Sequence, residues 1–158
     1  MGHSKETQAL RRRQLDRKLG RIDVAALQPP PEGWVRATRQ ALGINGRQLA
    51  ERLGVSRSQV SHIERAERSM ELTMQTLVRV AEGLECNLVY ALVPRRGSLE
   101  ETVNRRARKV ATSLVERIAG SMALEAQPTD VEERERLIDS TAADLVRTLD
   151  KSLWDVEP

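Results

Sequence analysis

Apolar residues recur every three or four positions through most of this chain, which is the spacing of amphipathic α-helices. Residues 5–28 carry a weak apolar stripe in a basic background, and the three prolines at 29–31 then interrupt it. The helical spacing returns in four short stretches between 31 and 84. It returns again in two longer stretches within 98–158, where the pattern predicts an antiparallel helical hairpin. We therefore expect a mainly α-helical protein.

Turn and capping signals predict two helices in close succession, at 45–53 and 56–65. Gly54 lies between them, at the position where helices commonly end in a left-handed residue. Ser56 is followed three residues later by Gln59, the spacing of a capping box that starts a helix. Further N-cap candidates are Thr73, Ser98 and Thr129.

Residues 86–94, CNLVYALVP, break the helical spacing and predict a short β-strand, because they combine β-branched and aromatic residues and end in proline. A lone strand in a helical chain has no sheet to join, so its edges must be covered or paired. One possibility is an intersubunit ribbon with the same strand of a second copy, about a two-fold axis. The alternative is a hydrophobic segment that packs on the helices.

The breaks in the pattern divide the chain into three expected parts. Residues 1–30 form a basic N-terminal helical arm, and residues 31–94 form a helix-turn-helix domain with the terminal strand. Residues 95–158 form the C-terminal helical hairpin. The expected fold is a helix-turn-helix bundle with one short strand and flanking N- and C-terminal helices.

Composition and charge refine this picture. Only 2% of the residues are aromatic, so the core must consist of aliphatic side chains. Residues 1–31 contain seven Lys/Arg and three Asp/Glu, whereas residues 98–158 contain nine and thirteen. The basic N-terminal part suggests contact with a polyanion, and the acidic C-terminal part suggests a different partner. Because the imbalance of charge is small, the alternative is that these charged residues simply form solvated surfaces.

Several classes of function lack support in the sequence. The single cysteine, Cys86, excludes an internal disulfide framework and a cysteine-based zinc site, and we expect it to be a buried apolar side chain. Apolar runs are too short to span a membrane, and no signal-like apolar region follows the start, so we expect a cytoplasmic protein. Phosphate-binding loops and H-E-x-x-H are missing, which leads us to expect no enzyme activity, no cofactor and no metal.

The segment 54–67, GVSRSQVSHIERAE, carries polar residues that no core requires. A recognition helix enters the DNA major groove by its N-terminal part, where side chains of the first two turns reach base edges. The predicted base-reading residues are Arg57, Ser58, Gln59 and His62. The predicted phosphate contacts are Asn45, Arg47, Ser56 and Ser61, helped by helix N-terminal amides. For Ser61, an idle surface hydroxyl is an equal alternative.

These residues carry a family resemblance. LGINGRQLAERLGVSRSQVSHIERAE, followed by LTMQTLVRVAEGL, resembles the phage-repressor (Cro/CI, XRE-type) helix-turn-helix domain. The resemblance implies a bundle of about five helices that binds a palindromic operator in double-stranded DNA as a homodimer, and hence a transcriptional repressor or autoregulator. It also implies a structural ion pair between Arg39 and Glu64.

The sequence departs from that family at three places. Gly46 replaces the usual glutamine that contacts phosphate, Ala66 replaces the usual glycine after the recognition helix, and 86–94 replaces the fifth helix. The first departure moves the expected phosphate contact to Asn45 and Arg47.

A longer resemblance covers residues 5–155, through the basic arm, GRQLAERLGVSRSQVSHIERAE and CNLVYALVP. These features resemble the bacterial family called mobile mystery protein A, whose members are encoded beside a Fic-domain protein. The resemblance implies, as an alternative function, an antitoxin that neutralises a Fic-domain partner and uses DNA binding for autoregulation.

Fic inhibition uses S/T-x-x-x-E followed by Gly or Asn. Thr112 to Glu116 and Ser121 to Glu125 have this spacing without the final residue, so an inhibitory glutamate and a solvated one remain alternatives. The hairpin itself is expected either to face such a partner or to enlarge the dimer interface.

Overall fold

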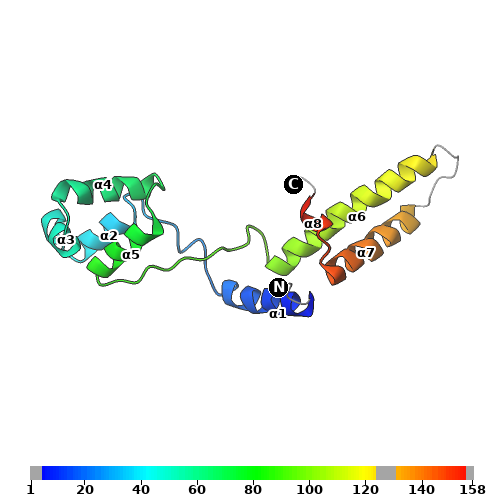
Figure 1. Cartoon of the computed structure of the whole chain (residues 1–158), viewed down its shortest axis with the longest axis horizontal. Helices are drawn as coiled ribbons and strands as arrows, with labels where there is room; N and C mark the ends of the chain where they lie inside the picture. The colour runs from blue at the N-terminus through cyan, green and yellow to red at the C-terminus, as the bar shows by residue number, and fades with distance from the viewer. Residues whose placement is uncertain (1–4, 124–130, 156–158) are drawn as a thin grey trace. The chain divides into compact units, whose positions relative to one another are not determined.

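A computed structural model describes residues 5–123 and 131–155 of the protein (Figure 1). Its helices, in chain order, are α1 Lys5–Leu19, α2 Trp34–Ala41, α3 Gly46–Leu53, α4 Arg57–Arg68, α5 Met74–Gly83, α6 Leu99–Ala123, α7 Val131–Thr148 and α8 Ser152–Asp155. The chain divides into two compact units. We call Asp23–Ala91 the central unit, and Met1–Ile22 together with Leu92–Pro158 the terminal unit. The mainly helical fold is confirmed.

Four short helices, α2 to α5, enclose the core of the central unit, as the apolar spacing predicted. Each helix contributes buried aliphatic side chains, and a residue that follows α5 completes the set: Val35, Leu49, Ala50, Val60, Val80 and Leu84. Aliphatic packing of this kind is the main source of stability for helices too short to persist alone. The core therefore holds α3 and α4 in place from their inner sides.

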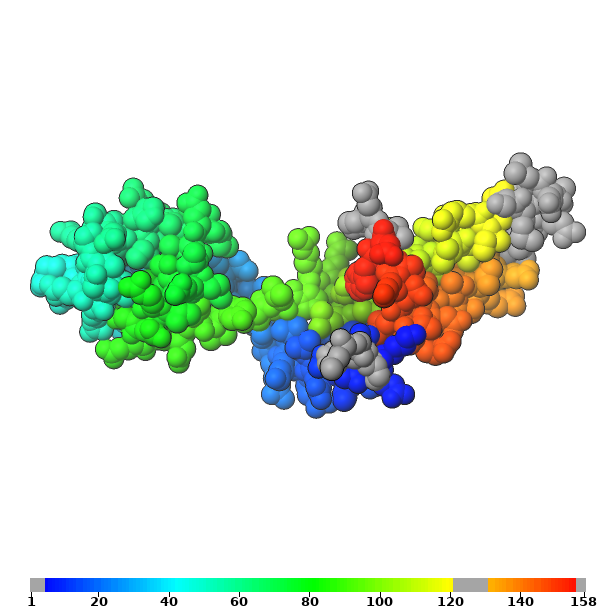
Figure 2. Space-filling view, in the orientation of Figure 1, coloured from blue at the N-terminus to red at the C-terminus, as the bar shows by residue number. Residues whose placement is uncertain are grey.

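The terminal unit contains the predicted hairpin of α6 and α7. Its apolar stripes turn toward each other: Val103, Ala107, Ala111, Val115 and Ile138 are buried between the helices, and Leu153 of α8 closes one end. Figure 2 shows α6 and α7, in yellow and orange, in close contact along the hairpin. The sequence pattern did not separate α8 from α7.

Ion pairs line the surface of the hairpin. Arg108 donates to both Glu135 and Asp139 of α7, and Arg134 donates to Glu116 at 3.2 Å. The hydrogen bond to Asp139 is the main reason that the pKa of Arg108 lies above its usual value. Several basic residues of the hairpin are therefore neutralised by carboxylates of the same hairpin.

Helix α1 packs on α6, so the N-terminal arm is not a separate part of the structure. Asp16 accepts hydrogen bonds from the backbone N–H groups of Leu99 (2.7 Å) and Glu100 (3.1 Å). In this way it caps the first turn of α6. Arg12 pairs with the Glu100 side chain at 2.5 Å. The terminal unit thus combines residues that the sequence divided between an arm at 1–30 and a hairpin at 95–158.

The strand predicted at 86–94 is not found: no residue of the described chain is assigned to a strand. Its side chains also do not cover the helices, since Val89, Tyr90 and Leu92 are 81%, 77% and 89% exposed. A single chain offers this segment no partner strand. The expectation that Cys86 is buried is wrong as well, because the residue is exposed at the start of this unpaired segment. None of the described helices is long and apolar enough to cross a membrane.

Candidate nucleic-acid interface

Helices α3 and α4 are joined by a tight turn at Gly54 and Val55 (Figure 1). Gly54 has φ 65° and ψ 35°, a left-handed conformation that carries no steric penalty for glycine. The N–H groups of Gly54 and Val55 donate back to carbonyl oxygens of α3, which satisfies the last turn of that helix. The direction in which α4 leaves the turn is therefore fixed by the backbone.

Both helices begin with a reciprocal capping box. Asn45 accepts from the Gln48 N–H at 2.9 Å, and the Gln48 side chain accepts from the Asn45 N–H at 2.8 Å. Ser56 and Gln59 repeat the arrangement at the start of α4, at 3.2 and 2.8 Å. The Gln59 side chain is thus turned back toward Ser56, and its amide oxygen already accepts one hydrogen bond. Bidentate recognition of adenine uses the oxygen as well as the NH₂ group, so the Gln59 oxygen would have to accept a second hydrogen bond or leave the capping box.

The predicted base-reading side chains all lie on the exposed side of the first two turns of α4. Arg57, Ser58, Gln59 and His62 are exposed, as is Ser61, whereas Val60 between them is buried. The Ser58 hydroxyl lies 2.9 Å from that of Ser56. The imidazole of His62 has no hydrogen-bond partner among the described residues. The exposed side of α4 therefore combines a cation, a hydroxyl and an imidazole.

Arg57 lies beside Gly46, at the start of α3. A Cβ added to Gly46 would be 3.9 Å from both Cγ and Nε of Arg57, an ordinary van der Waals distance. The guanidinium has no ion-pair or hydrogen-bond partner in the described part of the chain. Arg57 is thus an unneutralised cation that lies beside Gly46, where α3 has no side chain.

Arg47, a predicted phosphate contact, pairs with Glu51 one turn later on α3. Both side chains are well exposed, at 67% and 61%. Exposed pairs of this kind contribute little, about 0–1 kcal/mol, so a phosphate could displace the carboxylate at small cost. Asn45 and Ser56 act as N-caps, and Ser61 donates weakly to the Arg57 carbonyl at 3.4 Å. These three side chains are occupied within the chain.

The Arg39–Glu64 ion pair ties α4 to α2 behind the exposed face. Arg39 Nε donates to Glu64 Oε1 at 2.7 Å, and its NH1 group donates to the Ile44 carbonyl at 3.0 Å. The side chains are only 13% and 12% exposed. A single guanidinium therefore connects α2, the segment that enters α3, and the recognition helix.

Glu67 makes a second link between α4 and α2, one that sequence reasoning missed. Its carboxylate accepts from the N–H groups of Trp34 (2.9 Å) and Val35 (3.0 Å), and so caps α2. Gly33, at the cap position, has φ 84°, and a Cβ there would lie 2.6 Å from Glu67 Oε2. No local signal could identify this cap, because its acceptor lies on α4, two helices further along the chain.

Only one of the two candidate inhibitory glutamates lies within the described residues. Glu116 pairs with Arg134 across the hairpin of the terminal unit, and Glu125 lies outside the described residues. Among the residues that the structure describes, no group of three or more His, Cys, Asp or Glu side chains could hold a metal ion.

Comparison with known families agrees with this geometry. Residues 35–90 match the helix-turn-helix family model HTH_3, which covers all four helices of the central unit and the start of the exposed segment. The match supports a DNA-binding regulator of the XRE type. No curated protein and no solved structure matches the chain. The longer resemblance to mobile mystery protein A is not confirmed.

We expect Arg39→Met to destabilise the central unit by about 3–5 kcal/mol, because it leaves the Glu64 carboxylate largely buried without a partner. The double variant Arg39→Met/Glu64→Leu should recover part of that loss, since neither charge remains. Urea unfolding followed by circular dichroism measures both. Arg36→Met is the matched control on the same helix, at an exposed arginine, and should change stability by less than about 0.5 kcal/mol. Equal losses in Arg39→Met and Arg36→Met would contradict a structural role for the pair.

Proposed function

We propose, starting from a helix-turn-helix domain at residues 35–90, that this protein is a sequence-specific transcriptional regulator. It acts by binding DNA rather than by catalysis, as a repressor or autoregulator on a palindromic operator. The observation that carries the proposal is the division of α4 into two sides. Val60, Glu64 and Glu67 fix the helix to the core and to α2, while Arg57, Ser58 and His62 are exposed on its first two turns.

Within this proposal, Arg57 is the principal base-reading residue. An arginine can donate two hydrogen bonds to the O6 and N7 atoms of guanine, and the guanidinium of Arg57 has no competing partner within the described chain. Ser58 and His62 can donate to or accept from several base edges. Gln59 contributes mainly its NH₂ donor, since its oxygen already accepts from the Ser56 N–H in the capping box.

Phosphate contacts in the proposal come from the starts of α3 and α4. Helix N-termini present unpaired N–H groups and a positive dipole end to an anion. Asn45 and Ser56 support these contacts by holding the first turns in shape rather than by touching phosphate themselves. Arg47 adds a cation that can leave Glu51 for the DNA. Ser61 would contact phosphate only by giving up its 3.4 Å hydrogen bond to the Arg57 carbonyl.

The proposed dimer forms through the segment 86–94. Its exposed apolar side chains and its β-forming composition suit pairing with the same segment of a second copy. Two recognition helices related by a two-fold axis would then meet half-sites about 34 Å apart, or a multiple of that distance.

Arg57→Ala should weaken operator binding by about 1–3 kcal/mol and relax base preference at one position of each half-site. Fluorescence anisotropy on an operator series with single base changes measures both effects. Arg65→Ala, at the other end of the same helix, removes an equal charge and should leave base preference unchanged. Arg47→Ala should instead weaken binding to all sequences and reduce the salt slope by about 0.9. Unchanged affinity and preference in Arg57→Ala would refute the role given to Arg57.

Val89→Pro should convert the dimer to a monomer, because proline removes a backbone donor from a strand ladder. Val89→Thr is the matched control, since threonine retains the donor and the β-branched shape. Analytical ultracentrifugation over a concentration series reports the oligomeric state. A dimer that persists unchanged in Val89→Pro would show that 86–94 does not pair between copies.

Exposed apolar residues on α6 and α7 favour a second candidate function, that of an antitoxin. Ile118, Val131 and Leu137 are exposed although the stripes between the helices are buried, and such residues suit a protein partner. The expected partner is a Fic-domain protein encoded beside this gene. A neighbouring gene that encodes an H-P-F-x-x-G-N-G motif would support this candidate. A genome in which no such gene lies beside this one would count against it.

A further inference from the structure

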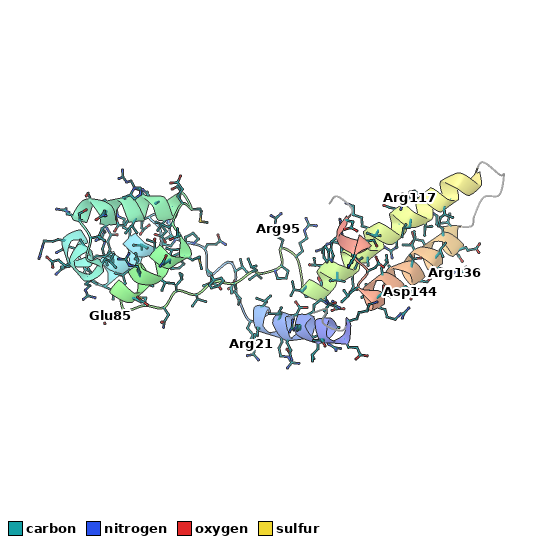
Figure 3. The ribbon with its side chains drawn as sticks, viewed as in Figure 1. Arg21, Glu85, Arg95, Arg117, Arg136 and Asp144 are labelled. Carbon is teal, nitrogen blue, oxygen red and sulfur yellow. The ribbon has the colours of Figure 1, made fainter. Side chains whose placement is uncertain are left out.

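Helix α1 has an inner and an outer face of different character. Its half-buried side includes Arg12, Asp16 and Leu19, and the first two of these hold the start of α6. Its exposed residues include five cations: Arg11, Arg13, Arg17 and Lys18 on the helix, and Arg21 just beyond it. We call these five the basic face of α1. Figure 3 labels Arg21 next to the end of the α1 ribbon.

No residue of the basic face has a hydrogen bond or ion pair from its side chain within the described chain. Several arginines elsewhere in the terminal unit differ in this respect. Arg12, Arg108, Arg134, Arg136 and Arg147 each pair with a carboxylate. Arginine therefore has two roles in one unit, since it neutralises acids within the scaffold and remains unpaired on the outside of α1.

Unpaired like charges repel one another, so such a face weakens its own helix unless it meets an anion. Two rows reinforce this repulsion, because Arg13 and Arg17 are one turn apart and Arg11 and Lys18 are two turns apart. Glu6 is the one carboxylate of α1 besides Asp16, and Asp16 is occupied by α6. The basic face thus lacks an acidic counterpart on its own helix.

We propose that the basic face of α1 is a second DNA-binding surface, which contacts the phosphate backbone beside the site bound by α4. This inference rests on the proposed function, namely that the protein binds double-stranded DNA. Side chains of this kind, long and cationic with no fixed hydrogen-bond geometry, recognise phosphates without reading sequence. The surface would add affinity and salt dependence to the complex, while α4 supplies its specificity.

The connections between the units permit such a contact. Residues 20–33 join α1 to α2, and an extended chain spans about 3.3–3.6 Å per residue, which gives a maximum reach on the order of 45 Å. That reach exceeds one turn of the DNA helix, about 34 Å. Once α4 is bound, the basic face is confined near the same duplex, and a weak phosphate contact then gains from a high effective concentration.

DNA fits the basic face better than the acidic hairpin of a second copy does. The hairpin carboxylates Glu116, Glu135, Asp139 and Asp144 are already paired with arginines of their own hairpin. A duplex, in contrast, presents a dense row of phosphates whose counterions are released when cations bind.

The test compares Arg13→Gln/Arg17→Gln with Arg136→Gln/Arg147→Gln, two variants of the full chain that each lose two positive charges. Binding to an operator duplex with long flanks, and to a random-sequence duplex, is measured against salt concentration. We expect the α1 variant to reduce the log–log salt slope by about 1.8 on both duplexes, which is about 30-fold in affinity near 0.15 M salt. Its base preference should not change, and the α7 variant should match the wild type.

Three results would overturn the proposal: an unchanged slope in the α1 variant, an equal loss in both variants, or loss of self-association without a change in slope. The last would assign the basic face to a second copy. The random-sequence duplex separates this inference from the proposed function. If wild type binds every sequence equally, recognition by α4 fails, yet the slope difference on random DNA still decides whether α1 contacts phosphate.

Discussion

The ion pair between Arg39 and Glu64 is the constraint on which the geometry of the recognition helix depends. A largely buried carboxylate is tolerated only with a cation and hydrogen bonds around it, and here one guanidinium supplies the ion pair while it also donates to Ile44. Since Ile44 leads into α3, the pair fixes α2, the entry to α3 and α4 at one point. The exposed residues of α4 then face one direction together, because the contacts on the inner side of the helix fix its orientation.

The two units share a second device, a carboxylate that caps a helix from another part of the chain. Glu67 of α4 caps α2, and Asp16 of α1 caps α6. Each contact joins two elements and also satisfies N–H groups that a helix leaves open at its start. Helices α1 and α6 lie far apart in sequence, yet Asp16 of α1 caps the start of α6. This cap therefore forms only when the two segments have come together during folding.

Features that depend on neighbours in sequence were predicted, and features that depend on distant partners were not. The helix starts at Ser56 and Thr73 follow from side chains that bond three residues ahead, and such a spacing is visible in the sequence. The cap at Gly33 and the packing of α1 on α6 were not predicted, since their acceptors come from other helices. Gln59 is an intermediate case: the sequence suggested both a capping and a reading role, and the structure shows its amide oxygen in the cap.

The segment 86–94 shows a different limit of sequence reasoning. Its β-forming residues predict a strand, but a strand is defined by hydrogen bonds to a neighbour, and a single helical chain supplies no neighbour. Val89, Tyr90 and Leu92 are accordingly exposed. Side-chain composition therefore indicates the conformation the backbone favours, whereas a strand exists only where a second strand pairs with it.

Net charge alone says little about how this protein meets DNA, because pairing decides which charges are available. The chain has an excess of only three positive charges, and many of its arginines serve as internal partners of carboxylates. The unpaired cations of the described chain include Arg57 on α4 and the five of the basic face of α1. In our proposal the first reads bases, because an arginine at the start of the recognition helix can donate two hydrogen bonds to guanine. The second is a row of flexible side chains, for which only the density of negative charge matters. Specificity and electrostatic affinity would thus belong to different helices of the same chain, and each could change in evolution without loss of the other.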